Sequence, residues 1–216
     1  MTTQSEKKRR PGRPKEPEKR QHLLTMARIT FAEKGYDGAR LQHIADAAGL
    51  SKPALFHHFP SKDALYEAVL DGTVQDLASY VAASSGRAGT HIERLRELAG
   101  NLADYFGSTP DSAKLLLREF VNGGPYTSGK GKALVLKTLT MASDFLASGM
   151  SAGVFQSSEP ERLVMAGTAD LLFYYGAHEL ADTLLGSSSS SAKNLAIQRE
   201  EVIKHFCRLV AVTDDA

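Results

Sequence analysis

Apolar side chains recur every three or four residues along most of this 216-residue chain. That spacing predicts amphipathic α-helices, and no alternating strand pattern competes with it. The first helix is expected over residues 18–34, where Leu24, Ala27 and Phe31 share one face. Gly35 should end this helix in the way that a C-cap glycine does. The pattern therefore predicts an all-α fold.

Residues 41–62 contain the most informative pattern, two short helices broken by a glycine and followed by the start of a third. Gly49 permits a left-handed turn, Ser51 is a suitable N-cap, and Pro53 is tolerated in a first helical turn. The expected inward-facing positions are Leu41, Ile44, Ala45, Ala48, Leu55 and Phe59. The positions left outside on the second short helix are Lys52, Pro53, Ala54, Phe56, His57 and His58. A recognition helix enters the major groove of DNA in this geometry.

The rest of the chain predicts a larger helical domain. A long helix over residues 61–84 begins at the motif and runs onward, which makes it the candidate lever between two domains. Further helices are expected over residues 90–106, 109–121, 130–148, 158–185 and 194–212. The serines of residues 187–191 predict a flexible linker. The expected division is an arm (1–17), a three-helix DNA-binding domain (18–70) and a helical domain (71–216).

Charge is segregated along the chain, although the net charge is only +1. Residues 1–20 hold 8 Lys/Arg and 3 Asp/Glu, whereas residues 71–216 hold 13 basic and 17 acidic side chains. Positive charge therefore collects at one end, where an anionic polymer would attract it.

The basic arm contains a Gly-Arg-Pro core in residues 9–15, which resembles an AT-hook. Pro11 and Pro14 favour an extended backbone, Gly12 permits close approach, and Arg13 can enter a narrow A·T minor groove. Arg10 and Arg13 are the expected contacts. The alternative is a solvated basic tail. Because the arm precedes a DNA-reading motif, we favour minor-groove contact.

The ordered motif resembles the DNA-binding domain of the tetracycline-repressor (TetR) family of transcriptional regulators over about residues 20–70. The resemblance rests on Phe31, Gly35-Tyr36, Ile44-Ala45, Ala48-Gly49-Leu50-Ser51, Leu55-Phe56-His57-His58-Phe59, Lys62 and Leu65. It implies that base edges are faced by Gln42, Lys52, Pro53 and Ala54, beside the N-cap Ser51. It also implies that Phe56, His57, His58 and Lys62 lie along the phosphates.

Lys62 is also unusual in its local electrostatic environment. It follows the N-cap candidate Ser61 at a positive helix terminus, where a lysine is unfavourable until an anion arrives. A phosphate would resolve that conflict.

Two positions depart from the family pattern. Arg40 stands where the family usually has a Thr or Ser that caps a helix and contacts a phosphate, so the helix loses its obvious cap. His57 replaces the tyrosine that family members often offer to a phosphate. Arg40 is expected to contact the DNA backbone by charge instead.

The resemblance further implies a homodimer, formed through the last two long helices, and an internal cavity for an unknown small-molecule effector. Small residues in the penultimate long helix would allow close helix approach. The candidate cavity residues are Tyr105, Phe106, Phe120, Tyr126, Phe145, Phe173, Tyr174 and His178. The alternative for these aromatic side chains is ordinary core packing.

Other functional classes lack support in the sequence. No catalytic triad, paired catalytic carboxylates, phosphate loop or Cys/His metal cluster is present, so we expect no enzyme, no cofactor and no metal. The adjacent histidines His57 and His58 diverge by about 100° on a helix and lack further ligands. Cys207 is expected to be a small core residue. No apolar run is long enough to span a membrane, and no secretory signal is visible, so the expected location is cytoplasmic.

The favoured hypothesis is a homodimeric transcription factor, most simply a repressor, that binds a near-palindromic operator in double-stranded DNA and is released by an apolar or amphipathic effector. The alternative is an architectural protein that coats A·T-rich DNA without an effector. A completely filled helical domain would favour that alternative.

Overall fold

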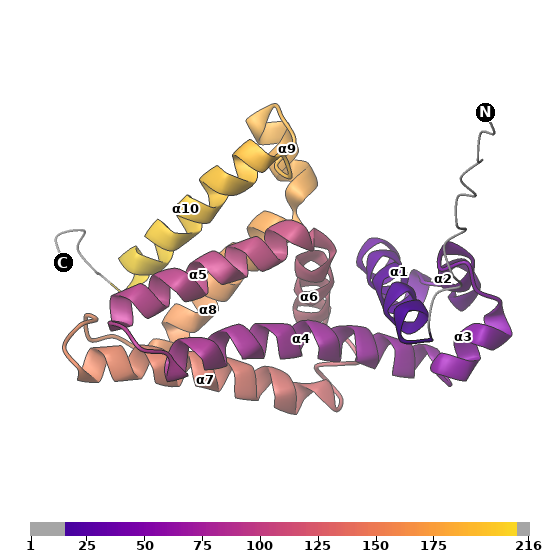
Figure 1. Ribbon diagram of the computed structural model, residues 1–216, viewed down its shortest axis with the longest axis horizontal. Helices are drawn as coiled ribbons and strands as arrows, with labels where there is room; N and C mark the ends of the chain where they lie inside the picture. Colours follow the sequence, from indigo (N-terminus) through magenta and orange to yellow (C-terminus); the bar gives the residue numbers. More distant parts are fainter. Residues whose placement is uncertain (1–15, 211–216) are drawn as a thin grey trace, which may run out of the picture.

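The computed structural model describes residues 16–210, which are built from α-helices joined by turns, with no strand in that range (Figure 1). The helices are α1 (Glu16–Gly38), α2 (Leu41–Ala47), α3 (Lys52–His58), α4 (Lys62–Gly86), α5 (His91–Ser108), α6 (Pro110–Asn122), α7 (Gly131–Ser151), α8 (Pro160–Gly176), α9 (His178–Leu185) and α10 (Ala192–Leu209). The predicted all-α fold class is confirmed.

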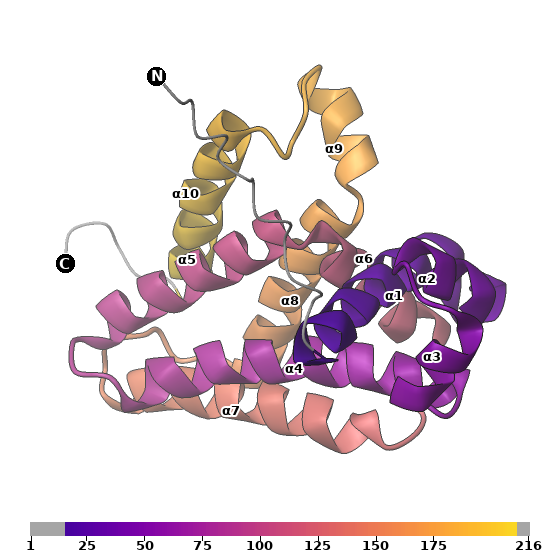
Figure 2. The same cartoon turned by 45° about the vertical axis from the view of Figure 1, so that its right-hand side comes forward.

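Helix α4 organises the molecule. It starts in the three-helix unit formed by α1, α2 and α3 at one end, and it runs along α7 into the larger helical region (Figure 1). Helix α5 packs against α4 and α10, while α8 packs against α6 and α7. Helix α6 also packs against α1, so it touches the three-helix unit directly (Figure 2). Two helices of the larger region, α4 and α6, therefore meet α1.

The backbone of α1 is interrupted near its end, at the predicted glycine. Gly35 has φ +71°, a left-handed value that interrupts the helix within the range of α1. Beyond it, the Tyr36 ring packs edge-on against Tyr66 of α4, with 5.0 Å between ring centroids. Phe31 packs against the same Tyr66 ring at 4.8 Å. These rings bind the end of α1 to the start of α4.

The single helix expected over residues 158–185 is wrong, because the chain breaks at Ala177 into α8 and α9. A Cβ added at Gly176 would lie 3.2 Å from the backbone of Lys114 in α6. The glycine thus allows α8 to approach α6 closely, and glycine is a poor helix former. The break coincides with this close contact between α8 and α6, which the local sequence pattern does not reveal.

The serine segment between α9 and α10 forms a hydrogen-bonded turn instead of the expected flexible linker. The Asp182 carboxylate accepts a hydrogen bond from the Ser189 backbone N–H. Ser191 caps α10 by accepting from the Asn194 N–H, and the Asn194 amide donates to the Ser188 carbonyl. Ser189 is accordingly buried.

One continuous apolar core joins the three-helix unit to the larger helical region. Cys207 is buried in it, as expected for a small core residue. Between residues 16 and 210, no helix has both the length and the apolar character needed to cross a bilayer.

Candidate nucleic-acid interface and internal cavity

The two short helices pack as the sequence predicts. Ile44 and Ala45 of α2 and Leu55 of α3 have no exposed surface. Gly49 takes φ +65° in the intervening turn, and the Leu50 N–H donates to the Ala45 carbonyl at 2.9 Å. This turn fixes α3 across α2 and leaves one side of α3 free.

The start of α3 is capped by a side chain. Ser51 Oγ accepts a hydrogen bond from the Ala54 N–H at 3.3 Å, and Pro53 occupies the first turn. Lys52, Pro53, Phe56 and His57 are exposed, while Ala54 and His58 are half-buried. Most residues assigned to base edges and phosphates therefore lie on α3, whereas exposed Gln42 lies on α2, Arg40 precedes α2 and Lys62 begins α4.

Several of these polar side chains already have partners within the protein. Gln42 Nε2 donates to Asp46 Oδ1 at 2.8 Å on the exposed side of α2. The Lys52 ammonium lies 6.0 Å from the Phe56 ring centroid. Arg40 precedes α2 without a side-chain capping bond, as its departure from the family pattern predicts.

Lys62 has local partners that the sequence did not reveal. Its ammonium donates to the Asp37 carbonyl at 3.2 Å and lies 4.6 Å from the Tyr36 ring centroid. The Tyr36 hydroxyl donates to the Asp63 carboxylate, and that bond is the main reason that the pKa of Tyr36 rises to about 12. The expectation that Lys62 lacks compensation until a phosphate arrives is therefore wrong.

The arm residues Arg10 and Arg13 lie outside the described residues. The point where the arm joins the fold is described, because Glu16 opens α1. The Glu16 carboxylate lies 3.6 Å from His58 Nε2 of α3 and bonds to Lys19. The bond to Lys19 is the main cause that lowers the pKa of Glu16. The arm thus joins the fold beside α3.

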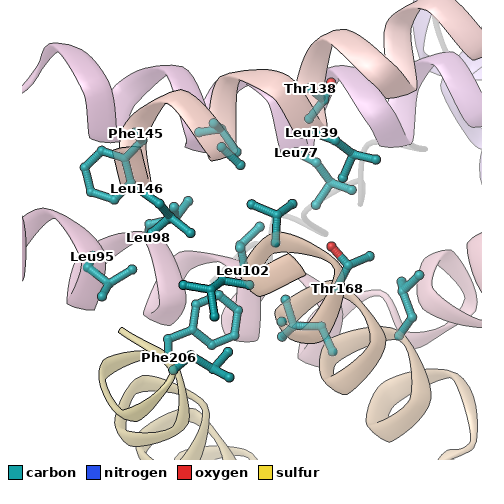
Figure 3. Close-up of a pocket in the computed structure, with 18 of the residues that line it drawn as sticks. Leu77, Leu95, Leu98, Leu102, Thr138, Leu139, Phe145, Leu146, Thr168 and Phe206 are labelled. Atoms are coloured by element: carbon teal, nitrogen blue, oxygen red, sulfur yellow. The ribbon is translucent and has the colours of Figure 1, made fainter. Parts of the chain in front are cut away.

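An internal cavity of about 130 Å³ lies in the larger helical region. Its walls come from α4, α5, α6, α7, α8 and α10, and Figure 3 shows side chains from these helices pointing toward a common space. The labelled lining residues are Leu77, Leu95, Leu98, Leu102, Thr138, Leu139, Phe145, Leu146, Thr168 and Phe206. Every lining side chain is apolar except those of Thr138 and Thr168. The Thr138 hydroxyl donates to the Leu134 carbonyl of its own helix.

Three of the eight candidate cavity residues, Phe106, Phe120 and Phe145, line this space. The other five are Tyr105, Tyr126, Phe173, Tyr174 and His178, and they lie elsewhere. Tyr126 is buried with its hydroxyl bonded to Asp71 at 2.7 Å, and Phe173 is 60% exposed.

The lining residues that sequence reasoning missed are mainly aliphatic. The clearest available signal was the leucine spacing of α5, which places Leu95, Leu98 and Leu102 on one face. Periodicity shows that such a face is covered, but it cannot distinguish a packed neighbour from an empty space.

Large apolar side chains remain exposed on the last three helices of the isolated chain. Met165 and Phe173 of α8 are 59% and 60% exposed, and Ile197 of α10 is 51% exposed. Leu184 of α9 is 78% exposed. Among residues 16–210, no group of three or more His, Cys, Asp or Glu side chains could hold a metal ion.

Comparison with known proteins agrees with this organisation. The family of bacterial regulatory proteins called tetR matches residues 23–69, which span the three-helix unit and the start of α4. The HTH-type transcriptional activator FasR of Mycolicibacterium smegmatis is 36% identical over 108 residues, which cover 50% of this chain and 49% of FasR. The match thus spans about half the length of that relative.

Two solved structures show the same fold over most of the chain. The TetR family regulator PfmR from Thermus thermophilus has a TM-score of 0.70 at 20% identity, covering 94% of this chain and 100% of PfmR. AibR, solved in complex with isovaleryl coenzyme A and operator DNA, has a TM-score of 0.67 at 16% identity, covering 91% and 100%. The family match shows that residues 23–69 belong to the tetR family of bacterial regulatory proteins, and the two solved structures show that most of the chain shares their fold.

Proposed function

We propose that the chain is a homodimeric transcriptional repressor that an apolar or amphipathic effector releases from its operator. The observation that supports this proposal is that one helix, α4, contacts both the DNA-binding unit and the internal cavity. Helix α4 begins beside the exposed recognition helix α3, and its residues Val74, Leu77 and Val81 line the internal cavity. A molecule that fills the cavity acts on the helix that positions α3.

On the DNA side, the exposed surface of α3 enters the major groove. Lys52, Pro53 and Ala54 face base edges, with Gln42 of α2 beside them. His57, His58, Phe56, Arg40 and Lys62 follow the phosphates. The arm, through Arg10 and Arg13, follows the neighbouring minor groove, and the position of Glu16 beside His58 supports this reach.

Dimerisation uses the last two long helices, α8 and α10. Their exposed Met165, Phe173 and Ile197 support this assignment, because a second copy would remove that apolar surface from water. Two recognition helices related by a twofold axis would then read successive major grooves about one helical turn apart.

The effector is a molecule whose buried part is uncharged. The lining offers two threonine hydroxyls and no charged side chain, so a charge at its centre would lose hydration without compensation. A cavity of about 130 Å³ is comparable to one that accepts a benzene-sized molecule. An aliphatic chain or small ring suits it, and a polar head would have to remain outside.

The alternative of an effector-independent architectural protein is not favoured. That hypothesis predicts a filled helical domain, whereas this domain contains a cavity with nearly uniform apolar walls. The direct test is a selection from random double-stranded DNA, followed by anisotropy titration of the selected sequence against unselected competitor at moderate salt. Equal affinity for the two DNAs would refute the repressor proposal.

A matched pair of variants assigns the binding surface. Lys52→Ala is expected to weaken binding to the selected sequence by about tenfold, because a base-edge contact contributes ~1–3 kcal/mol. Lys137→Ala removes the same charge from the exposed side of α7 and should leave affinity nearly unchanged. Equal losses in both variants would show that Lys52 acts only through overall charge.

A further inference from the structure

We propose that the hydrogen bond between Tyr66 and the buried Glu119 carboxylate is the joint through which the effector cavity controls α4. This inference rests on the proposed function and adds the residues that transmit the response. In this scheme Tyr66 and Glu119 are positioning residues that contact neither DNA nor effector.

Glu119 is a charged side chain with only 1% of its surface exposed. Its Oε2 accepts from the Tyr66 hydroxyl at 2.7 Å. Its Oε1 accepts from the backbone N–H of Thr127 at 2.7 Å and from the Thr127 hydroxyl at 3.0 Å. Three donors from two different segments thus converge on one carboxylate.

Tyr66 connects that carboxylate to the DNA-binding unit. Its ring lies edge-on against Phe31 and Tyr36, both from α1, while its hydroxyl reaches Glu119 on α6. Tyr36 in turn holds Asp63 and supports Lys62 at the start of α4. Two side-chain contacts, from Tyr66 to Tyr36 and from Tyr36 to Lys62, therefore connect Tyr66 to the proposed phosphate contact.

Glu119 lies on the same part of α6 as two residues that line the cavity. Leu116 and Phe120 of the same helix line the internal space, one on each side of it in sequence. The preceding Arg118 donates to the Glu33 carbonyl at the end of α1, at 3.3 Å. One short stretch of α6 thus contacts the cavity, α4 and α1.

The turn after α6 is folded around the carboxylate. Gly123 adopts the left-handed φ of +57°. Gly124 follows, and a Cβ at that position would overlap the Glu119 carboxylate. Tyr126 then fastens the turn to α4 by donating to Asp71 at 2.7 Å. The carboxylate therefore has little room to move independently of α6.

The bond couples the two helices because breaking it is unfavourable. A buried carboxylate that loses a donor retains its desolvation cost without compensation, and this cost is larger for charged groups than for neutral ones. Helices α4 and α6 share few other direct contacts, so without this bond they could shift relative to each other more freely. A displacement of α6 by a cavity occupant should thus move Tyr66 with it.

The test uses full-length protein and the DNA sequence selected by the wild type. Ala142→Phe places a phenyl ring at the cavity wall and serves as a built-in occupant, so no effector needs to be identified. We expect it to weaken binding to the selected DNA by about tenfold, within the range of allosteric couplings. In the Tyr66→Phe background, the same change should weaken binding by less than about twofold.

Tyr126→Phe is the matched comparison, because it breaks the other tyrosine–carboxylate bond that joins this turn to α4 and so tests whether the coupling is specific to Tyr66. It also removes a hydroxyl from a buried tyrosine that bonds a carboxylate at 2.7 Å, but it leaves Tyr66 and Glu119 intact. Thermal unfolding should show a larger loss of stability for Tyr66→Phe, because Asp71 is only half-buried and water can replace its lost donor, whereas Glu119 is fully buried. The effect of Ala142→Phe should remain about tenfold in the Tyr126→Phe background.

Glu119→Gln gives a second route if Tyr66→Phe folds poorly, because its amide oxygen can still accept from Thr127 while its amide NH2 makes only a weaker, neutral hydrogen bond to the Tyr66 hydroxyl. It too should reduce the effect of Ala142→Phe. An undiminished effect in both the Tyr66→Phe and Glu119→Gln backgrounds would overturn the proposal, as would Ala142→Phe leaving wild-type binding unchanged. If no DNA sequence is selected at all, the proposed function itself fails.

Discussion

The turn after α6 offers a sharp test of the structure, because its two adjacent glycines are required for different reasons. Gly123 has a left-handed backbone with nothing within 4 Å of a Cβ placed there. Gly124 is not left-handed in this sense, but its Cβ would collide with the Glu119 carboxylate. Alanine at the two positions should therefore cost different amounts of stability.

The cost at Gly123 is conformational. A non-glycine residue in the left-handed region costs ~1–2 kcal/mol, and the open space around it adds no collision. The Gly123→Ala variant should lose about this much free energy of unfolding and keep the turn intact.

The cost at Gly124 combines a collision with broken hydrogen bonds. Overpacking costs ~1–3 kcal/mol, and each hydrogen bond to a charged group contributes ~1.5–3 kcal/mol. Moving the Glu119 carboxylate aside breaks at least one of its bonds to Tyr66 or Thr127. Gly124→Ala should therefore lose roughly 3–6 kcal/mol, a large part of the ~5–15 kcal/mol typical of a folded domain.

Thermal unfolding followed by circular dichroism at one fixed protein concentration measures both variants. In a chain of this size, 1 kcal/mol shifts Tm by about 2–4 °C, so Gly124→Ala should melt roughly 6–24 °C below wild type. Gly123→Ala should show less than half of that shift. Equal shifts, or a larger one for Gly123→Ala, would refute the packing of this turn around Glu119.

Three further predictions concern DNA and assembly. Asp46→Asn should tighten DNA binding about two- to fivefold in anisotropy titrations, because it removes an exposed negative charge beside Gln42. Deleting residues 1–15 should lower affinity and flatten the plot of log K against log salt, by ~0.9 for each phosphate that the arm no longer neutralises; an unchanged slope would exclude the arm from the interface. Phe173→Glu should convert the proposed dimer to a monomer in size-exclusion chromatography with light scattering, while Leu136→Glu, at a similarly exposed apolar position of α7, should not.

The fold was largely predictable because its main signals are local. Gly35 and Gly49 both have the left-handed backbone expected of them, and the helix expected from residue 90 begins with a capping box formed by Thr90 and Glu93. The errors arose where contacts outside the local helical pattern determine the structure. Gly176, the last residue of α8, lies close against α6, and the serine turn is hydrogen-bonded by Asp182 and Asn194.

The candidate sites were predictable to different extents for the same reason. The exposed face of α3 follows from the positions of Leu55 and Phe59, which the pattern assigns to the core. A cavity is a property of six helices at once, so aromatic content was a poor guide to it. The buried carboxylate of Glu119 was also invisible, because a Glu on an amphipathic helix is usually on its solvated side.

The DNA-binding surface and the proposed joint meet at Tyr36. Lys62, Gln42 and His58 each lie against a partner within the protein, so the proposed DNA contacts would replace existing contacts with new ones. The net affinity is then a small difference, and a shift of a few kcal/mol toward the DNA-free arrangement is enough to empty an operator. Tyr36 supports Lys62 on one side and packs on Tyr66 on the other. A movement transmitted through Tyr66 would therefore act on a contact that is already balanced between protein and phosphate.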